Sequence, residues 1–153
     1  MSTRAIRHLN RKGIFFALIK YEHEEKGAEF AARATGFALE RTVKTLVVDL
    51  GGRNYCLTLL PGDCQLDLKR LAQVFAVKRA ALADAATAER LTGYLLGGIS
   101  PFGTKQSLPA VMDKRIREHA EVLINAGQRG LMLKMAPEDI VRALGCRVAE
   151  VGR

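Results

Sequence analysis

Residues 44–60 read KTLVVDLGGRNYCLTLL, and this stretch decides the class of fold. Its first seven residues are mostly apolar or β-branched, which predicts a buried strand, and residues 55–60 predict a second strand. Gly51-Gly52-Arg53-Asn54 lies between them, and glycine supplies the positive φ that a hairpin turn requires. Strands joined by so short a turn are antiparallel, which excludes a strict alternation of parallel strands and crossover helices.

Short helices and short strands are expected on both sides of this hairpin. Asp67 and Asp84 are N-cap residues followed by apolar periodicity, and Pro137 is suited to the first position of a last helix that ends at Gly145. The helices are expected at 3–12, 29–35, 68–75, 85–91 and 137–144, and the further strands at 15–21, 109–112, 122–125, 131–135 and 147–151. We therefore predict one α+β domain over residues 1–153, with a curved, mixed, partly barrel-like sheet surrounded by short helices.

Composition limits the classes of function. The chain has 153 residues, 48% of them hydrophobic, which excludes intrinsic disorder. The net charge of +8 is dispersed in basic pairs, so it fits a domain that contacts nucleic acid and equally a domain that is merely soluble. No apolar run approaches the ~18 residues of a membrane span. Residues 1–21 are basic but lack a cleavage site, so we expect a cytoplasmic protein without membrane contact.

Side chains for common catalytic or metal chemistry are few. Cys56, Cys64 and Cys146 lack the paired spacing of a zinc site, so we expect buried free thiols and neither metal nor cofactor. No G-x-S-x-G elbow accompanies the three histidines.

Two features stay open at this point. The glycine-rich run 97–103 is either a tight bend in the sheet or a set of backbone N–H groups that holds an ester carbonyl. Lys44, in an apolar strand, either reaches solvent at the strand end or points into a cleft as a cation for phosphate or a developing negative charge.

Four segments closely resemble, in order, the YbaK/EbsC family of free-standing aminoacyl-tRNA deacylases, which is related to the editing domain of bacterial prolyl-tRNA synthetases. They are Val-Lys-Thr-Leu-Val-Val at 43–48, Gly-Tyr-Leu-Leu-Gly-Gly-Ile-Ser-Pro-Phe-Gly at 93–103, Gly-Gln-Arg-Gly-Leu at 127–131 and Ala-Pro-Glu-Asp at 136–139. The resemblance covers residues 3–151 and implies the fold of that family.

The resemblance implies an enzyme that hydrolyses mischarged Cys-tRNA(Pro), and by extension Cys-tRNA(Cys), with the substrate thiol attacking its own ester. A water-based reaction on Ala-tRNA(Pro) or another small mischarged amino acid stays open, as does a non-catalytic tRNA- or synthetase-binding module. The implied partners are the aminoacylated 3′ adenosine of the tRNA acceptor end and prolyl-tRNA synthetase. The oligomeric state is not indicated.

The same resemblance assigns site residues. Lys44 is expected to hold the tRNA end and the ester, and Gly98 to contact the ester carbonyl. The residues expected to bind substrate are Tyr21, Phe30, Thr45, Gly97, Ile99, Ser100, Pro101, Arg129 and Asp139. One departure concerns the pocket wall: the Phe-Gly pair that many members place before the second helix falls at Gly27-Ala28 here, with Phe30 one turn away.

Overall fold

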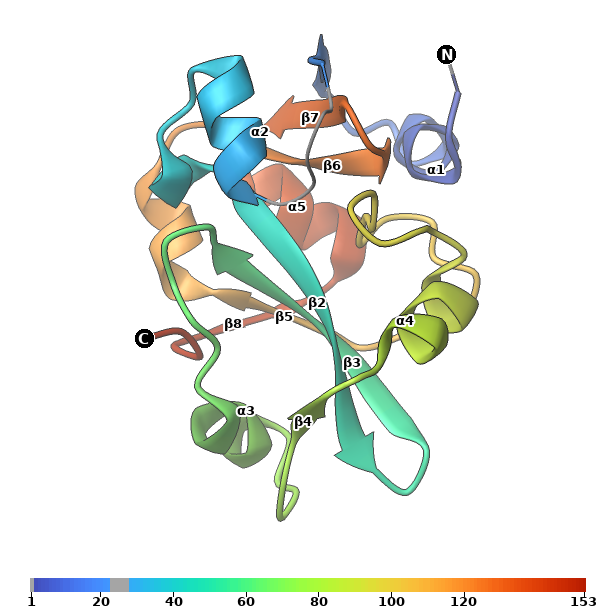
Figure 1. The fold of residues 1–153 in the computed structure, drawn as a ribbon, viewed down its shortest axis with the longest axis vertical. Helices are drawn as coiled ribbons and strands as arrows, with labels where there is room; N and C mark the ends of the chain where they lie inside the picture. Colours follow the sequence, from blue (N-terminus) through green and yellow to red (C-terminus); the bar gives the residue numbers. More distant parts are fainter. Residues whose placement is uncertain (1, 23–27) are drawn as a thin grey trace.

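The structure is a computed structural model that describes residues 2–22 and 28–153. The described chain forms two β-sheets (Figure 1). The smaller sheet is antiparallel, in the order β1 (Ala17–Lys20), β7 (Leu131–Met135), β6 (Val122–Gln128). The larger sheet has the order β4 (Ala81–Leu82), β2 (Val43–Gly51), β3 (Asn54–Pro61), β5 (Ala110–Asp113), β8 (Arg147–Ala149). The β4-β2-β3 part is antiparallel and the β3-β5-β8 part is parallel, so this sheet is mixed.

The predicted hairpin is the longest paired element of the larger sheet. Lys44 faces Leu60 and Val48 faces Cys56 in the β2–β3 register, which shifts only after Asp49. At the turn, the backbone N–H of Gly51 donates to the carboxylate of Asp49 at 2.8 Å. The antiparallel hairpin is therefore confirmed.

The predicted helices also form, and two of their caps are the residues expected from sequence. The side chain of Asp67 accepts a hydrogen bond from the N–H of Arg70 at 3.1 Å, and that of Asp84 accepts one from Thr87 at 2.8 Å. The α-helices are α1 (Arg4–Arg11), α2 (Ala28–Thr35), α3 (Leu68–Val74), α4 (Ala85–Thr92) and α5 (Pro137–Leu144), and the 3₁₀ helices are η1 (Leu39–Arg41) and η2 (Lys114–Glu118).

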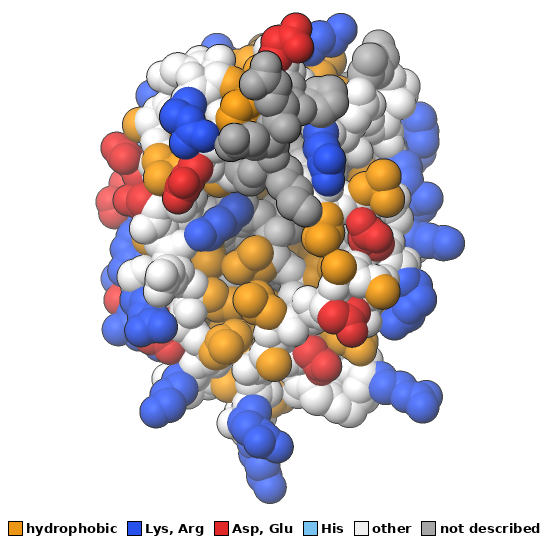
Figure 2. Space-filling model, viewed as in Figure 1, with side chains coloured by type: hydrophobic (Ala, Val, Ile, Leu, Met, Phe, Trp, Pro, Cys, Tyr) orange, Lys and Arg blue, Asp and Glu red, His pale blue; other side chains and the backbone are white. Residues whose placement is uncertain are grey.

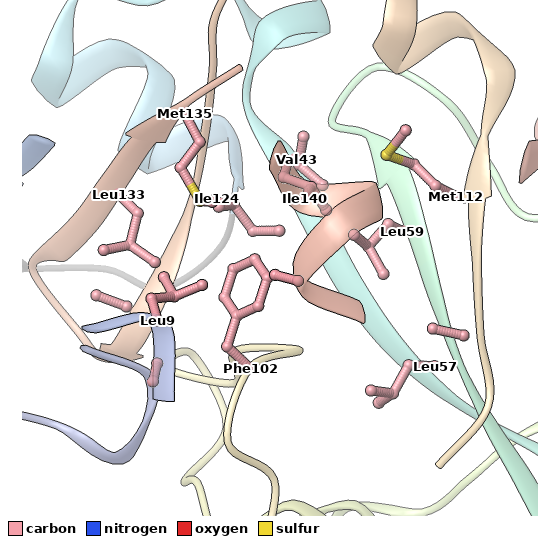
Figure 3. Packing of buried hydrophobic residues seen from close by; sticks show 14 of the residues in the cluster. Leu9, Val43, Leu57, Leu59, Phe102, Met112, Ile124, Leu133, Met135 and Ile140 are labelled. Atoms are coloured by element: carbon pink, nitrogen blue, oxygen red, sulfur yellow. The ribbon is translucent and has the colours of Figure 1, made fainter. Parts of the chain in front are cut away.

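Phe102 holds the two sheets and the glycine-rich loop together. Its ring is fully buried between side chains of the smaller sheet, such as Ile124, and side chains of the larger sheet, such as Leu57 (Figure 3). The hydroxyl of Tyr94 donates to the backbone carbonyl of Phe102 at 2.5 Å. The loop that carries the glycine motif is thus anchored in the main core.

The sequence predicted one curved sheet, whereas the described strands divide into two. An isolated parallel bridge between Thr42 and Leu123 connects them, and the described strands do not close a barrel. β4 was not predicted because two residues are too few to show an alternating pattern. As a result, no strand of the described chain lies beside the outer edge of β2 between the bridge at Thr42 and the pairing at Val48.

Candidate active site

A pocket of about 230 Å³ lies beside this open stretch of β2, between α2, the loop after α4 and the β6–β7 hairpin. Pockets for drug-sized ligands measure ~300–1,000 Å³, so this one suits a smaller group. Its described lining residues come from segments far apart in the sequence: Tyr21, Ala28, Ala31, Val43, Lys44, Thr45, Leu46, Leu96, Gly97, Ile99, Asn125 and Met132.

Lys44 is the only charged side chain among these described lining residues. It is half-buried, and its ammonium forms no hydrogen bond or ion pair within the part of the chain that the structure describes. An unpaired cation beside apolar walls interacts more strongly with an anion than it does in bulk water. The pocket can therefore bind a phosphate or stabilise an oxyanion.

The open edge of β2 adds backbone groups to the pocket. The carbonyl of Val47 accepts from the N–H of Ala83 at 3.0 Å, so Val47 directs its backbone groups away from β3. Residues two apart in a strand direct their backbone groups to the same side, which places those of Thr45 on the same outer edge. The hydroxyl of Thr45 is buried there without a hydrogen-bond partner in the described chain.

The glycine-rich loop forms the wall of the pocket opposite β2. Its two adjacent glycines, Gly97 and Gly98, have different surroundings. Gly97 lines the pocket. Gly98 packs against the β6–β7 turn, where a Cβ would lie 3.1 Å from the backbone nitrogen of Arg129, and its own N–H donates to the carbonyl of Leu95 at 2.9 Å. The N–H groups of Gly97 and Ile99, by contrast, donate to no acceptor in the described residues. The amides available to a ligand thus flank Gly98.

Asn125 is a pocket residue that the sequence analysis missed. Its Oδ1 accepts from the N–H groups of Gly127 at 2.7 Å and Gln128 at 3.1 Å, where the β6–β7 register shifts. Its Nδ2 donates to the carbonyl of Gly97 at 3.3 Å. The side chain therefore ties the β6 bulge to the glycine-rich loop. An asparagine followed by Ala-Gly inside a strand pattern is a bulge signal that would have drawn attention to it.

Tyr21 closes a third side of the pocket. Its backbone N–H donates to the carbonyl of Gly130 at 3.0 Å, which joins the end of β1 to the β6–β7 turn, and its side chain packs against the buried cluster that contains Met132. Burial raises the pKa of the Tyr21 hydroxyl, so it is neutral at physiological pH and can donate a hydrogen bond. Phe30 packs against the Tyr21 ring at 6.1 Å between centroids but does not line the pocket. Ala28 does line it, while Gly27 is outside the described residues.

Of the residues assigned to the site from the sequence, Lys44, Thr45, Gly97, Ile99 and Tyr21 line this pocket. The other expected residues are not among its described lining residues. The guanidinium of Arg129 donates to the carbonyl of the lining residue Leu96 at 2.9 Å and so helps to hold the glycine-rich loop in place.

Three more expected residues are buried or paired locally and are not among the described lining residues of the pocket. The hydroxyl of Ser100 accepts from the N–H of Phe102 at 3.3 Å, and the adjacent Pro101 is buried. Asp139 pairs with Arg142 at 2.8 Å in α5, where its charge complements the helix start. These expectations relied on sequence position within motifs, and burial or ion pairing keeps the side chains out of the pocket.

The described residues contain neither a metal-binding cluster nor a membrane-spanning helix. Among residues 2–22 and 28–153, no group of three or more His, Cys, Asp or Glu side chains could hold a metal ion. No helix in that part of the chain is long and apolar enough to cross a membrane.

Comparison with known proteins adds to this geometry. The family model of the aminoacyl-tRNA editing domain matches residues 22–143. The chain belongs to this aminoacyl-tRNA editing family. Its members include EbsC of Enterococcus faecalis, a proposed Cys-tRNA(Pro)/Cys-tRNA(Cys) deacylase, which is 30% identical over 131 residues, covering 86% of this chain and 80% of EbsC.

Two further relatives of the editing family are similar over most of their length. The multifunctional Ser/Thr-tRNA deacylase ProXp-y of Escherichia coli is 33% identical over 139 residues, covering 87% of this chain and 83% of that protein. A crystal structure of a proposed trans-editing enzyme for prolyl-tRNA synthetase superposes with a TM-score of 0.89 at 26% identity, covering 100% of this chain and 99% of the other. The YbaK/EbsC resemblance and the α+β fold class are thus confirmed.

Proposed function

We propose that the protein is a trans-editing deacylase that hydrolyses the aminoacyl ester of mischarged Cys-tRNA(Pro). The observation that carries the proposal is a small pocket with two kinds of donor that have no partner among the described residues: the Lys44 ammonium on one side, and the N–H groups of Gly97 and Ile99 on the other. Fit alone discriminates between similar small side chains by only about 1–3 kcal/mol, so a synthetase that charges the wrong small amino acid benefits from a second hydrolytic site.

Each pocket element then has a role in ester cleavage. Lys44 holds the tRNA end and offers its charge to the ester. The N–H groups of Gly97 and Ile99 stabilise the oxyanion that forms on the carbonyl oxygen, as preorganised donors do in other hydrolases. Gly98 allows the loop to pack closely on the β6–β7 turn and so positions these two amides.

The nucleophile comes from the substrate or from water. No cysteine, histidine or carboxylate lines the pocket among the described residues. With a cysteinyl ester, the thiol sulfur attacks the carbonyl carbon, the bond to the ribose oxygen breaks, and that oxygen takes the proton. Water then opens the resulting thiolactone to cysteine. The protein contributes orientation and charge stabilisation.

Serine and threonine esters are the second candidate substrates. The observation that favours them is the 33% identity to ProXp-y, which is named as a Ser/Thr-tRNA deacylase. These side chains share a small size and a polar atom on Cβ with cysteine. A hydroxyl is a weaker nucleophile than a thiol and has no advantage over water, so in that reaction we assign the attack on the carbonyl carbon to water.

The tRNA itself is held mainly through its phosphates. α1 carries Arg4, Arg7 and Arg11 without an acidic residue, and Thr3 at its start donates to the carbonyl of Ala126, beside the pocket residue Asn125. Figure 2 shows further Lys and Arg side chains along both margins of one face. Phosphate contacts do not read sequence, so selection of tRNA(Pro) falls to a partner such as prolyl-tRNA synthetase.

The test is deacylation of a panel of tRNA(Pro) charged with cysteine, serine, threonine, alanine or proline by the purified protein. We expect Cys-tRNA(Pro) to be cleaved fastest and Pro-tRNA(Pro) to be spared. Cleavage of none of the five would refute the deacylase function, and a preference for alanine would refute the substrate assignment. Among different tRNAs charged with cysteine, rates should agree within about tenfold, or 1.4 kcal/mol.

A further inference from the structure

Thr45 occupies a position where the alternation of β2 calls for an apolar side chain. Its neighbours on the same strand face, Val43 and Val47, are 3% and 5% exposed and belong to the main core, as does Leu59, which pairs with Thr45 across the hairpin. Threonine and valine have nearly the same shape, so valine would fill this position equally well. The hydroxyl adds a polar atom that packing does not need.

This hydroxyl weakens the fold. Oγ1 of Thr45 is buried and has no hydrogen-bond partner in the described residues. A buried polar atom without a partner loses its hydration and gains nothing in return. The backbone N–H and C=O of Thr45 also face the open edge of β2, so polar groups of one residue converge on the pocket. A ligand that forms a hydrogen bond with Oγ1 would offset the free-energy cost of burying this hydroxyl.

Two other polar side chains of the pocket, those of Asn125 and Lys44, are less suited to bond the same group as Thr45. The amide of Asn125 already makes its hydrogen bonds to the β6 bulge and to Gly97. Lys44 precedes Thr45 in the strand, so the two side chains leave β2 on opposite faces and reach the pocket from different sides. Most other lining side chains are apolar, such as Ile99 and Met132.

We propose that Thr45 reads the side chain of the esterified amino acid. Its Oγ1 bonds to the thiol of cysteine or the hydroxyl of serine, and alanine is disfavoured because it leaves Oγ1 unsatisfied. The inference rests on the proposed deacylase function. The tRNA is joined to the amino acid through the ester, so the amino-acid side chain extends away from the tRNA into the pocket, where Oγ1 of Thr45 is buried and has no partner among the described residues. A site built to bond a substrate hydroxyl rejects the analogue that lacks it.

The experiment compares kcat/KM for Ser-, Cys- and Ala-tRNA(Pro) in the wild type and in Thr45→Val. We expect the variant to lose about tenfold or more with serine, somewhat less with cysteine because a thiol is a weaker hydrogen-bond donor, and less than about twofold with alanine. We also expect its melting temperature to rise, since an unsatisfied buried hydroxyl is replaced by a methyl group. Equal losses with all three esters would overturn the inference, because Oγ1 would then serve the ribose or the α-amino group. An unchanged pattern would overturn it as well.

Two further variants control this result. Thr45→Ser keeps the hydroxyl and should keep the serine-to-alanine ratio. Thr58→Val makes the same chemical change at a fully buried position on β3 that does not line the pocket, and it should leave the ratio unchanged. A changed serine-to-alanine ratio in Thr58→Val would show that loss of a buried hydroxyl outside the pocket is enough to alter specificity. That result would contradict recognition of the side chain by Thr45.

A binding measurement separates this inference from the proposed function. Adenosine carrying seryl or alanyl through a 3′ amide cannot be hydrolysed, so it reports on the pocket alone. We expect the wild type to bind the seryl amide more tightly, by about tenfold, and Thr45→Val to bind both equally. Equal binding by the wild type overturns the role of Thr45 even if the enzyme is active. Inactivity towards every charged tRNA refutes only the deacylase function.

Discussion

Replacing Lys44 with methionine removes the ammonium and keeps most of the side-chain stem. Because the ammonium has no partner in the described chain, the free energy of unfolding should change by no more than about 0.5 kcal/mol. A hydrogen bond from a charged group to the reacting ester is worth about 1.5–3 kcal/mol, so kcat/KM should fall about 10- to 150-fold.

Lys134 provides a matched control for this variant. It is also a half-buried lysine within a strand, β7, but it does not line the pocket. Lys134→Met removes the same charge and should leave kcat/KM within about twofold. The assay is single-turnover deacylation of Cys-tRNA(Pro) with enzyme in excess, together with thermal unfolding of all three proteins.

The result that would refute the reasoning is a Lys44→Met variant that retains its rate within threefold, or an equal loss in Lys134→Met. The salt dependence tells which group Lys44 holds. If Lys44 neutralises a phosphate of the single-stranded tRNA end, the association constant of the Lys44→Met variant for tRNA should depend less on salt than that of the wild type. The slope of its logarithm against log salt concentration should become shallower by about 0.7. A role restricted to the oxyanion leaves the slope unchanged.

Two further substitutions test other parts of the site, and the reactivity of Cys56 tests the burial of the core. In Gly98→Ala the new Cβ would lie 3.1 Å from backbone atoms, so the loop must shift. We expect about 1–2 kcal/mol of destabilisation and loss of deacylation, and an unchanged melting temperature would contradict the close packing. Asn125→Asp keeps the acceptor for the bulge but loses the donor to Gly97, so its melting temperature should exceed that of Asn125→Ala, while both variants lose activity. Equal melting temperatures would argue against separate roles for the oxygen and the nitrogen of the amide. Burial raises the pKa of the Cys56 thiol to about 11, so the thiol stays protonated at pH 8, and mass spectrometry should find it alkylated only after urea is added.

Local chemistry explains why much of the fold is predictable from the sequence. The glycines of the 51–54 turn, and the carboxylates of Asp67 and Asp84, act on neighbours within three residues. The division into two sheets depends instead on Thr42 meeting Leu123, a contact between distant segments that no local pattern encodes.

The residues of the site also fall into those that local sequence predicts and those that depend on contacts between distant segments. Lys44 and Thr45 are next to one another in a recognisable strand, so their common location follows from the motif. Asn125 is marked in the sequence only by a bulge signal, and its contact with Gly97 appears only once the bulge of β6 lies beside the glycine-rich loop. Ser100 and Asp139 belong to the motif segments, yet local hydrogen bonds and a helix start account for their side chains.

The burial of Phe102 has a consequence for how the enzyme should respond to heat. Its ring is part of the main core and follows the amides of Gly97 and Ile99 by only a few residues. The pocket wall therefore cannot open as an independent lid without withdrawing that ring from the core. Thermal inactivation should coincide with global melting, and the backbone amide of Phe102 should exchange its hydrogen for deuterium only as fast as the whole protein unfolds.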